Sequence, residues 1–215
     1  MKKLVIFGAG GFGREVLQLV RDVNREAPAW ECAGFLVDGA PQAETLVQGL
    51  PVLGGVDWLR CNPDVEVVVA VGEPAARKKI VERLVSLGAV FATLIHPRAW
   101  LGEYVSVGRG CVICAGALIT TDIRLGEHVH VNIGTTIGHD SLLSDFVTVS
   151  PGVNVSGKVR LGDGVFLGSG AVLLPGVSVG EGAVIGANSV VLADLPPGCT
   201  AVGVPAKVVK SGIAS

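Results

Sequence analysis

The sequence predicts two architectures in one chain: a small α/β unit followed by a solenoid of short strands. Two observations lead to this prediction. Apolar residues recur at every sixth position from Ile95 to Val191, and before Ile95 strand-like segments alternate with helix-like segments. The composition agrees with tight, regular turns, because 31 of the 215 residues are glycine, about twice the usual share of roughly 7%.

The six-residue repeat has an aliphatic position followed by a glycine position. All seventeen residues at six-residue steps from Ile95 to Val191 are Ile, Leu or Val. Glycine comes next in eight of these hexads, namely Gly102, Gly108, Gly126, Gly138, Gly162, Gly168, Gly180 and Gly186. An α-helix repeats at about 3.6 residues and a strand at about 2, so this period is typical of short strands joined by tight corners. We expect the aliphatic side chains to fill the inside of each coil.

The first part of the chain reads as a small parallel α/β unit. Strands are predicted over residues 3–7, 32–37, 65–71 and 91–95, and helices over residues 14–24 and from residue 74 to a stop at residue 88. Gly8, Gly10 and Gly13 form a Gly-x-Gly-x-x-Gly loop between the first strand and the first helix, where bare backbone N–H groups can hold a phosphate. Asp38 follows the second strand and is placed to accept a hydrogen bond from a hydroxyl or amine. An NAD site and a turn without any ligand remain the alternatives for this loop.

The composition indicates which classes of partner and which cellular compartment to expect. The net charge is −2 and only 17% of the residues are charged, which argues against a nucleic-acid binder that relies on net charge. No apolar run approaches the roughly 18 residues of a membrane helix, and Gly8 interrupts the apolar start too early for a signal peptide. The five cysteines have no disulfide spacing. We therefore expect a cytoplasmic protein with reduced thiols, no nucleic-acid partner and no membrane insertion.

The hexads and the tail Gly203-Val204-Pro205-Ala206-Lys207 resemble the hexapeptide-repeat acyltransferases. That resemblance implies a left-handed parallel β-helix of five to six coils, a homotrimer, and a C-terminal tail near coenzyme A. Together with the half-Rossmann unit before it, the whole chain resembles the NeuD/PglD family of sugar acyltransferases. The implied domains are a nucleotide-sugar-binding α/β domain over 1–94, an acyltransferase β-helix over 95–202 and a tail over 203–215.

Acyl transfer needs a base, and His139 is the candidate. It lies at the hexad turn Ile137-Gly138-His139-Asp140-Ser141, so we expect its side chain to project outward, where Asp140 could fix the ring tautomer. By resemblance, His139 is the catalytic base and Asp140 the acidic residue that follows it. The resemblance also implies that acetyl-CoA donates the acetyl group and that the acceptor is the amino group of a nucleotide-linked 4-amino-6-deoxysugar.

The remaining site residues also come from the resemblance. The substrate-binding set is Gly10, Gly11, Phe12, Asp38, Gly72 and Asn132. The set that contacts coenzyme A is Thr148, Ser169, Ala187 and Lys207. Relatives often have histidine at the positions of Phe12 and Thr148, so this chain departs from the family there. Spacing independently relates Ser169 to Ala187, because they occupy the same position of hexads 18 residues apart.

No metal is expected. The γ-class carbonic anhydrases share the β-helix and bind zinc with three histidines, but His128-x-His130 does not match their spacing. Cys111-x-x-Cys114 lacks a partner pair, and Cys111 occupies an inward position that favours core packing. The alternative functions are O-acetylation of sialic acid or another sugar hydroxyl, and a non-catalytic scaffold trimer that binds nucleotide sugars.

Overall fold

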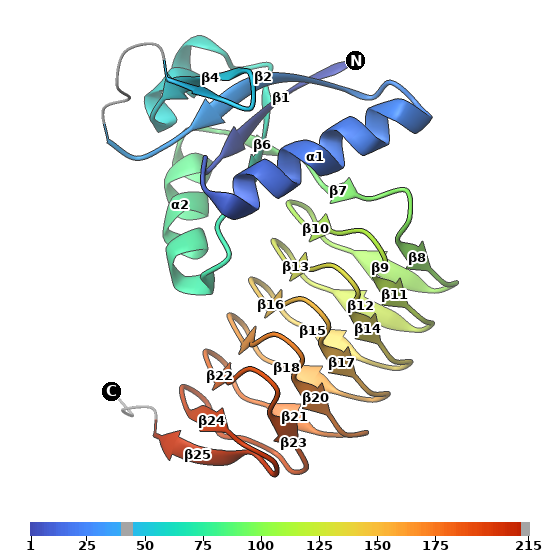
Figure 1. Ribbon diagram of the computed structural model, residues 1–215. Helices are drawn as coiled ribbons and strands as arrows, with labels where there is room; N and C mark the ends of the chain where they lie inside the picture. The colour runs from blue at the N-terminus through green and yellow to red at the C-terminus, as the bar shows by residue number, and fades with distance from the viewer. Residues whose placement is uncertain (40–44, 212–215) are drawn as a thin grey trace. The chain divides into compact units, whose positions relative to one another are not determined.

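The computed structural model describes residues 1–39 and 45–211 (Figure 1), and the chain divides between Pro97 and Arg98 into two compact units. The sequence boundary was expected after residue 94. Residues 212–215 of the expected C-terminal tail lie outside the described residues. Within the described ranges, no helix has the length and apolar character needed to cross a membrane. No disulfide joins the five cysteines, all of which lie in those ranges.

The first unit is built on a sheet with the strand order β3-β4-β2-β1-β5-β6. Its strands are β1 (Lys2–Phe7), β2 (Trp30–Leu36), β3 (Leu46–Val47), β4 (Leu50–Gly54), β5 (Glu66–Val69) and β6 (Val90–Phe91), and β7 (Leu94–Ile95) follows them. Strand β1 pairs in parallel with β2 and with β5. The carboxyl ends of these three strands therefore meet at one edge of the sheet, which we call the carboxyl edge. The sequence analysis missed the two-residue β3 and the five-residue β4, which pair with each other in antiparallel orientation.

Two α-helices and a 3-10 helix accompany this sheet among the described residues: α1 (Gly11–Glu26), α2 (Pro74–Ser86) and η1 (Val56–Cys61). Helix α1 begins three residues earlier than predicted, which makes Gly10 its N-cap. A Cβ atom at Gly13 would lie 1.9 Å from the carbonyl oxygen of Gly8, so glycine lets the helix cross closely over the end of β1. Helix α2 begins with Pro74, and the Glu73 side chain caps it by accepting hydrogen bonds from two backbone N–H groups.

The second unit is a parallel β-helix with three faces (Figure 1). Face A consists of β10 (Val112–Ile113), β13 (His130–Val131), β16 (Thr148–Val149), β19 (Phe166–Leu167), β22 (Val184–Ile185) and β24 (Thr200–Val202). Face B consists of β8 (Trp100–Leu101), β11 (Leu118–Ile119), β14 (Thr136–Ile137), β17 (Asn154–Val155), β20 (Val172–Leu173) and β23 (Val190–Val191). Face C consists of β9 (Val105–Val107), β12 (Ile123–Leu125), β15 (Leu142–Leu143), β18 (Arg160–Leu161) and β21 (Ser178–Val179). Strand β25 (Lys207–Lys210) pairs antiparallel with β24 at the C-terminal end.

Successive coils are in register at 18 residues. Leu118, for example, pairs with Trp100 on one side and with Thr136 on the other. The chain passes from face B to face C to face A within each coil, turning at corner BC, corner CA and corner AB. The predicted five to six coils are confirmed, because five complete coils run from β8 to β22 in the described residues and β23 and β24 belong to a sixth.

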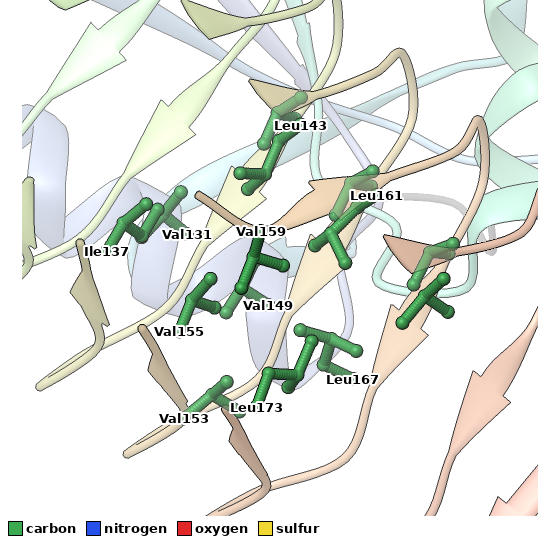
Figure 2. Close-up of a cluster of buried hydrophobic side chains, with 14 of the residues drawn as sticks. Val131, Ile137, Leu143, Val149, Val153, Val155, Val159, Leu161, Leu167 and Leu173 are labelled. Carbon is green, nitrogen blue, oxygen red and sulfur yellow. The ribbon is translucent and has the colours of Figure 1, made fainter. Parts of the chain in front are cut away.

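The hexad aliphatics fill the interior of the β-helix, as predicted. Figure 2 shows Ile137, Leu143 and Val149 pointing into this interior, and each is fully buried. Burying such a side chain contributes about 1.5–3 kcal/mol. The prediction is wrong for Ile95, which is exposed and precedes the first complete coil.

Candidate active site

His139 and Asp140 form a hydrogen-bonded pair at corner BC, between β14 and β15. The Nδ1 atom of His139 lies 2.7 Å from Oδ2 of Asp140, and the two side chains are 58% and 51% exposed. Asp140 has φ +60°, a left-handed conformation that aspartate tolerates better than most residues. This turn brings adjacent side chains together. A neutral imidazole that donates Nδ1–H to the carboxylate keeps a lone pair on Nε2, and the carboxylate can stabilise the ring once Nε2 is protonated.

Gly157, which the sequence reading missed, provides the space for the His139 ring. A Cβ atom at Gly157 would lie 2.6 Å from Nε2 and 2.7 Å from Cε1 of His139. The φ angle of Gly157 is not in the left-handed region, so space rather than backbone conformation explains glycine here. The next residue, Lys158, donates its backbone N–H to the His139 carbonyl at 2.7 Å. The available signal was the spacing, because Gly157 lies one coil, or 18 residues, after His139.

Ser141 follows this pair but points into the coil. Its hydroxyl donates to the carbonyl of Ser156 at 3.2 Å and accepts from the backbone N–H of Val159 at 3.2 Å, and its side chain is buried. A buried hydroxyl committed to two backbone groups is poorly placed to act as a nucleophile beside His139.

Asn132 and Thr148 lie on face A. Asn132 follows β13, and its Nδ2 donates to the carbonyl of Val149 at 2.9 Å. Thr148 belongs to β16, where its register partner in the preceding coil is His130, and its side chain is buried. The fold therefore places Thr148 on a strand and Asn132 directly after the neighbouring strand, while His139 lies at corner BC.

Ser169 and Ala187 both lie at corner AB, one coil apart, as their spacing predicts. The backbone N–H of Asn188 donates to the Ser169 carbonyl at 2.9 Å and ties the two turns together. A Cβ at Gly168 would lie 2.6 Å from the backbone nitrogen of Ala187, so the chain is closely packed here. Lys207 is the exposed first residue of β25. Corner AB and corner BC are the two edges of face B, so one chain does not bring Ser169 or Ala187 to His139.

The glycines expected to hold a nucleotide lie at the carboxyl edge of the first unit. Gly10 is the N-cap of α1 and Gly11 is its first residue, so the unbonded N–H groups of the helix begin there. Gly72 follows β5. A Cβ at Gly10, Gly11 or Gly72 would meet no atom within 4 Å, which leaves open space beside the backbone. The partial positive charge of a helix N-terminus in an open space suits an anion. Phe12, in the first turn, is half-buried.

Asp38 lies at the same carboxyl edge, as predicted, but it already has a charged partner. Arg83, in the last turn of α2, places Nη2 2.8 Å and 3.0 Å from the two carboxylate oxygens of Asp38. The sequence reading missed Arg83. No periodicity or motif relates residues 45 positions apart in an α/β unit, so only the fold could show this pair.

The residues considered as metal ligands pack as ordinary side chains. The ring of His128 stacks on Phe146 with centroids 5.2 Å apart. Cys111 is buried, and its thiol lies 3.1 Å from the carbonyl of Gly126. Across residues 1–39 and 45–211, no three His, Cys, Asp or Glu side chains gather closely enough to hold a metal ion.

Known protein families are similar to both units of this chain. The PglD N-terminal domain family matches residues 3–84, and the bacterial transferase hexapeptide family (six repeats) matches residues 158–193. The acetyltransferase domain of PglB from Neisseria gonorrhoeae FA1090, solved in complex with acetyl coenzyme A, is 34% identical. The match covers 97% of this chain and 99% of that chain, with a TM-score of 0.86. The chain belongs to the NeuD/PglD family.

Two further members are similar to this NeuD/PglD protein. A histidine-to-asparagine variant of perosamine N-acetyltransferase from Caulobacter crescentus, in complex with CoA and GDP-perosamine, is 30% identical, with 97% of each chain covered and a TM-score of 0.88. GDP-perosamine N-acetyltransferase from Escherichia coli O157:H7 is 31% identical over 62% of this chain and 61% of its own length. The match thus spans less than two thirds of this curated relative. The predicted fold class, a half-Rossmann unit followed by a hexapeptide β-helix, is confirmed.

Proposed function

We propose that this NeuD/PglD protein transfers the acetyl group of acetyl-CoA to the amino group of a nucleotide-linked 4-amino-6-deoxysugar. The observation that carries the proposal is the His139–Asp140 pair, an exposed imidazole oriented through Nδ1 by a carboxylate at 2.7 Å. The relatives support the substrate class. The similar PglB domain was solved with acetyl coenzyme A, and the similar perosamine N-acetyltransferase with CoA and GDP-perosamine.

The reaction proceeds by direct attack. The neutral amine attacks the thioester carbonyl, a C–N bond forms, and Nε2 of His139 removes a proton from the attacking nitrogen. Asp140 stabilises the imidazolium through Nδ1–H. The C–S bond then breaks, and the thiolate of CoA takes the proton that His139 holds. No acyl-enzyme is needed, which agrees with the buried and hydrogen-bonded hydroxyl of Ser141.

The residues assigned to coenzyme A need a second copy of the chain to lie near His139. Ser169 and Ala187 lie at corner AB, and His139 lies at corner BC of the same β-helix. A homotrimer of parallel β-helices can set corner AB of one copy against corner BC of its neighbour, and cyclic assembly repeats that contact three times. In this arrangement Lys207 completes the coenzyme A contacts, whereas the side chain expected to join it, Thr148, is buried within the single chain and presents almost no surface to the cofactor. The C-terminal tail, which begins at residue 203, then lies at the donor site.

The nucleotide part of the acceptor is assigned to the carboxyl edge of the first unit. Gly10, Gly11 and Phe12 place the N-terminus of α1 beside the diphosphate, and Gly72 leaves room on the other side of β1. Asp38 accepts hydrogen bonds from the nucleoside. Asn132 is assigned to the sugar.

The test is release of the CoA thiol from acetyl-CoA with a panel of acceptors. The panel holds UDP-, GDP- and TDP-linked 4-amino-6-deoxysugars and sialic acid. Turnover on an amino sugar, with an N-acetylated product by mass spectrometry, is the expected result. Turnover on sialic acid alone would replace the proposal by O-acetylation, and binding of nucleotide sugars without turnover would favour a scaffold.

A matched pair of variants examines the role of the carboxylate. Asp122 occupies the same corner position one coil before Asp140 and has φ +56°, close to that of Asp140. Asp140→Asn is expected to lower kcat by about 10²- to 10³-fold, because the amide cannot stabilise the imidazolium charge. Asp122→Asn is expected to leave kcat unchanged. Equal effects of the two substitutions would contradict the assigned role of Asp140.

A further inference from the structure

Arg83 joins the last turn of α2 to the carboxyl edge of the first unit. Its Nη2 donates to both oxygens of Asp38, and its Cζ lies 6.0 Å from the centroid of the Phe7 ring, at the end of β1. The Arg83 and Asp38 side chains are 47% and 58% exposed, so both face solvent. The arginine therefore holds an accessible carboxylate in one orientation at the carboxyl edge.

The Arg83–Asp38 ion pair contributes little to the stability of the fold. Ion pairs between exposed side chains contribute about 0–1 kcal/mol to folding. The same helix already contacts the carboxyl edge through Arg77, which is fully buried and whose Nη1 donates to the carbonyls of Val71 and Gly72 at 2.7 and 3.2 Å. Arg77 binds the backbone of the loop after β5, whereas Arg83 binds the side chain of Asp38.

The opposite charges of Arg83 and Asp38 fit a role in binding the nucleotide. The proposed function, on which this inference rests, brings a diphosphate to the N-terminus of α1 and a nucleoside to Asp38. An isolated carboxylate at that edge would repel the diphosphate. A guanidinium bound to both carboxylate oxygens offsets that charge and still leaves lone pairs for donors on the nucleoside, since each carboxylate oxygen can accept more than one hydrogen bond.

We propose that Arg83 is a positioning residue for nucleoside diphosphate recognition, which acts through Asp38 by orienting its carboxylate and offsetting its negative charge. Arg83 and Asp38 then operate as one unit in binding the nucleotide. The pair affects nucleotide affinity and leaves the acetyl-transfer step at His139 unchanged.

A double-mutant cycle measured with UDP, GDP and TDP as probes tests this proposal. Arg83→Met removes the guanidinium and keeps much of the chain length. It is expected to weaken the binding of the preferred nucleoside diphosphate by about tenfold, measured by titration calorimetry. In the Asp38→Asn background the same substitution is expected to change affinity by less than about threefold, because its partner is gone. With the nucleotide sugar, KM rises in Arg83→Met while kcat and the KM for acetyl-CoA stay unchanged.

Lys2→Met is the matched control. Lys2 is exposed and forms an ion pair at 2.7 Å with Glu66, which is more deeply buried, and it stands at the start of β1, at the opposite end of that strand from the carboxyl edge. This variant is expected to bind the probes as the unaltered protein does. Melting curves of all variants check that they are folded.

Two results would overturn the proposal. One is an affinity within twofold of the unaltered protein in Arg83→Met. The other is an equal loss with and without Asp38, which would mean that Arg83 contacts the nucleotide independently. Failure of the underlying function gives a different result, in which the unaltered protein binds none of the three probes, and that result would end both proposals.

Discussion

Gly157→Ala displaces the proposed base without removing any polar atom. The new Cβ would lie 2.6 Å from Nε2 of His139, whereas ordinary van der Waals contact begins at 3.4 Å. The three atoms nearest to the new Cβ all belong to the half-exposed His139 ring, so the ring moves by about 0.8 Å and the backbone stays in place. A misplacement of about 1 Å in a catalytic group costs on the order of 10²-fold. We expect kcat to fall by about 30- to 100-fold, which corresponds to about 2–3 kcal/mol in activation free energy.

The assay is steady-state thiol release with both substrates varied, together with a melting curve. KM for both substrates is expected to stay nearly constant, and so is Tm, because Gly157 does not have a left-handed φ that alanine would strain. Gly55→Ala is the control. Gly55 has φ −92°, and a Cβ there would meet only the carbonyl oxygen of Val37 at 3.6 Å. A kcat for Gly157→Ala within threefold of that control would refute the argument that the bare α-carbon positions His139.

Three other predictions concern stability and assembly. Burial raises the pKa of Asp22, but hydrogen bonds from His96 and Gln18 outweigh it and hold the pKa below its usual value. Asp22 therefore adds stability above its unfolded pKa, and this stability is lost as the pH falls through the folded pKa. At pH 6 the Tm of His96→Gln should lie below that of the unaltered protein, and in strong acid the two Tm values should converge. Leu143→Ala, in the coil interior, should cost about 2–5 kcal/mol in urea unfolding, and a loss below 1 kcal/mol would contradict the close packing of the coils. Co-expressing His139→Asn with Ser169→Trp should restore about one quarter of the activity that each loses alone. One of the three sites in a mixed trimer draws an intact base and an intact donor corner from different copies, and about three quarters of randomly assembled trimers are mixed. No restoration would contradict a shared site.

The β-helix could be predicted in detail because its repeat is local and exact. Each hexad carries an aliphatic residue for the interior and a turn, so the strand positions and the inward orientation of Leu143 follow from the period. The outward projection of His139 follows in the same way. Its contact with Asp140 required the left-handed turn at Asp140, which the sequence permits without specifying.

In the first unit, contacts between residues far apart in the sequence could not be predicted. The Arg83–Asp38 pair depends on how α2 lies against the sheet, and nothing in either local sequence encodes that approach. The start of α1 was also misplaced, since this helix begins at Gly11, within the glycine loop, rather than at Arg14, whereas α2 begins at Pro74 as predicted. A glycine loop is a weak signal for a helix start because glycine has low helix propensity, and here the close crossing of Gly13 over Gly8 overrides that propensity.

The proposed chemistry depends on a proton leaving the acceptor amine through His139, and His139→Asn tests that dependence directly. Asparagine can still donate a hydrogen bond to Asp140, but it cannot accept and hold a proton. With acetyl-CoA and the amino sugar that the unaltered protein prefers, the variant is expected to lose at least about 10²-fold in kcat while the Kd of the nucleotide sugar stays within about threefold. Turnover by His139→Asn within tenfold of the unaltered protein would contradict the assignment of His139 as the base.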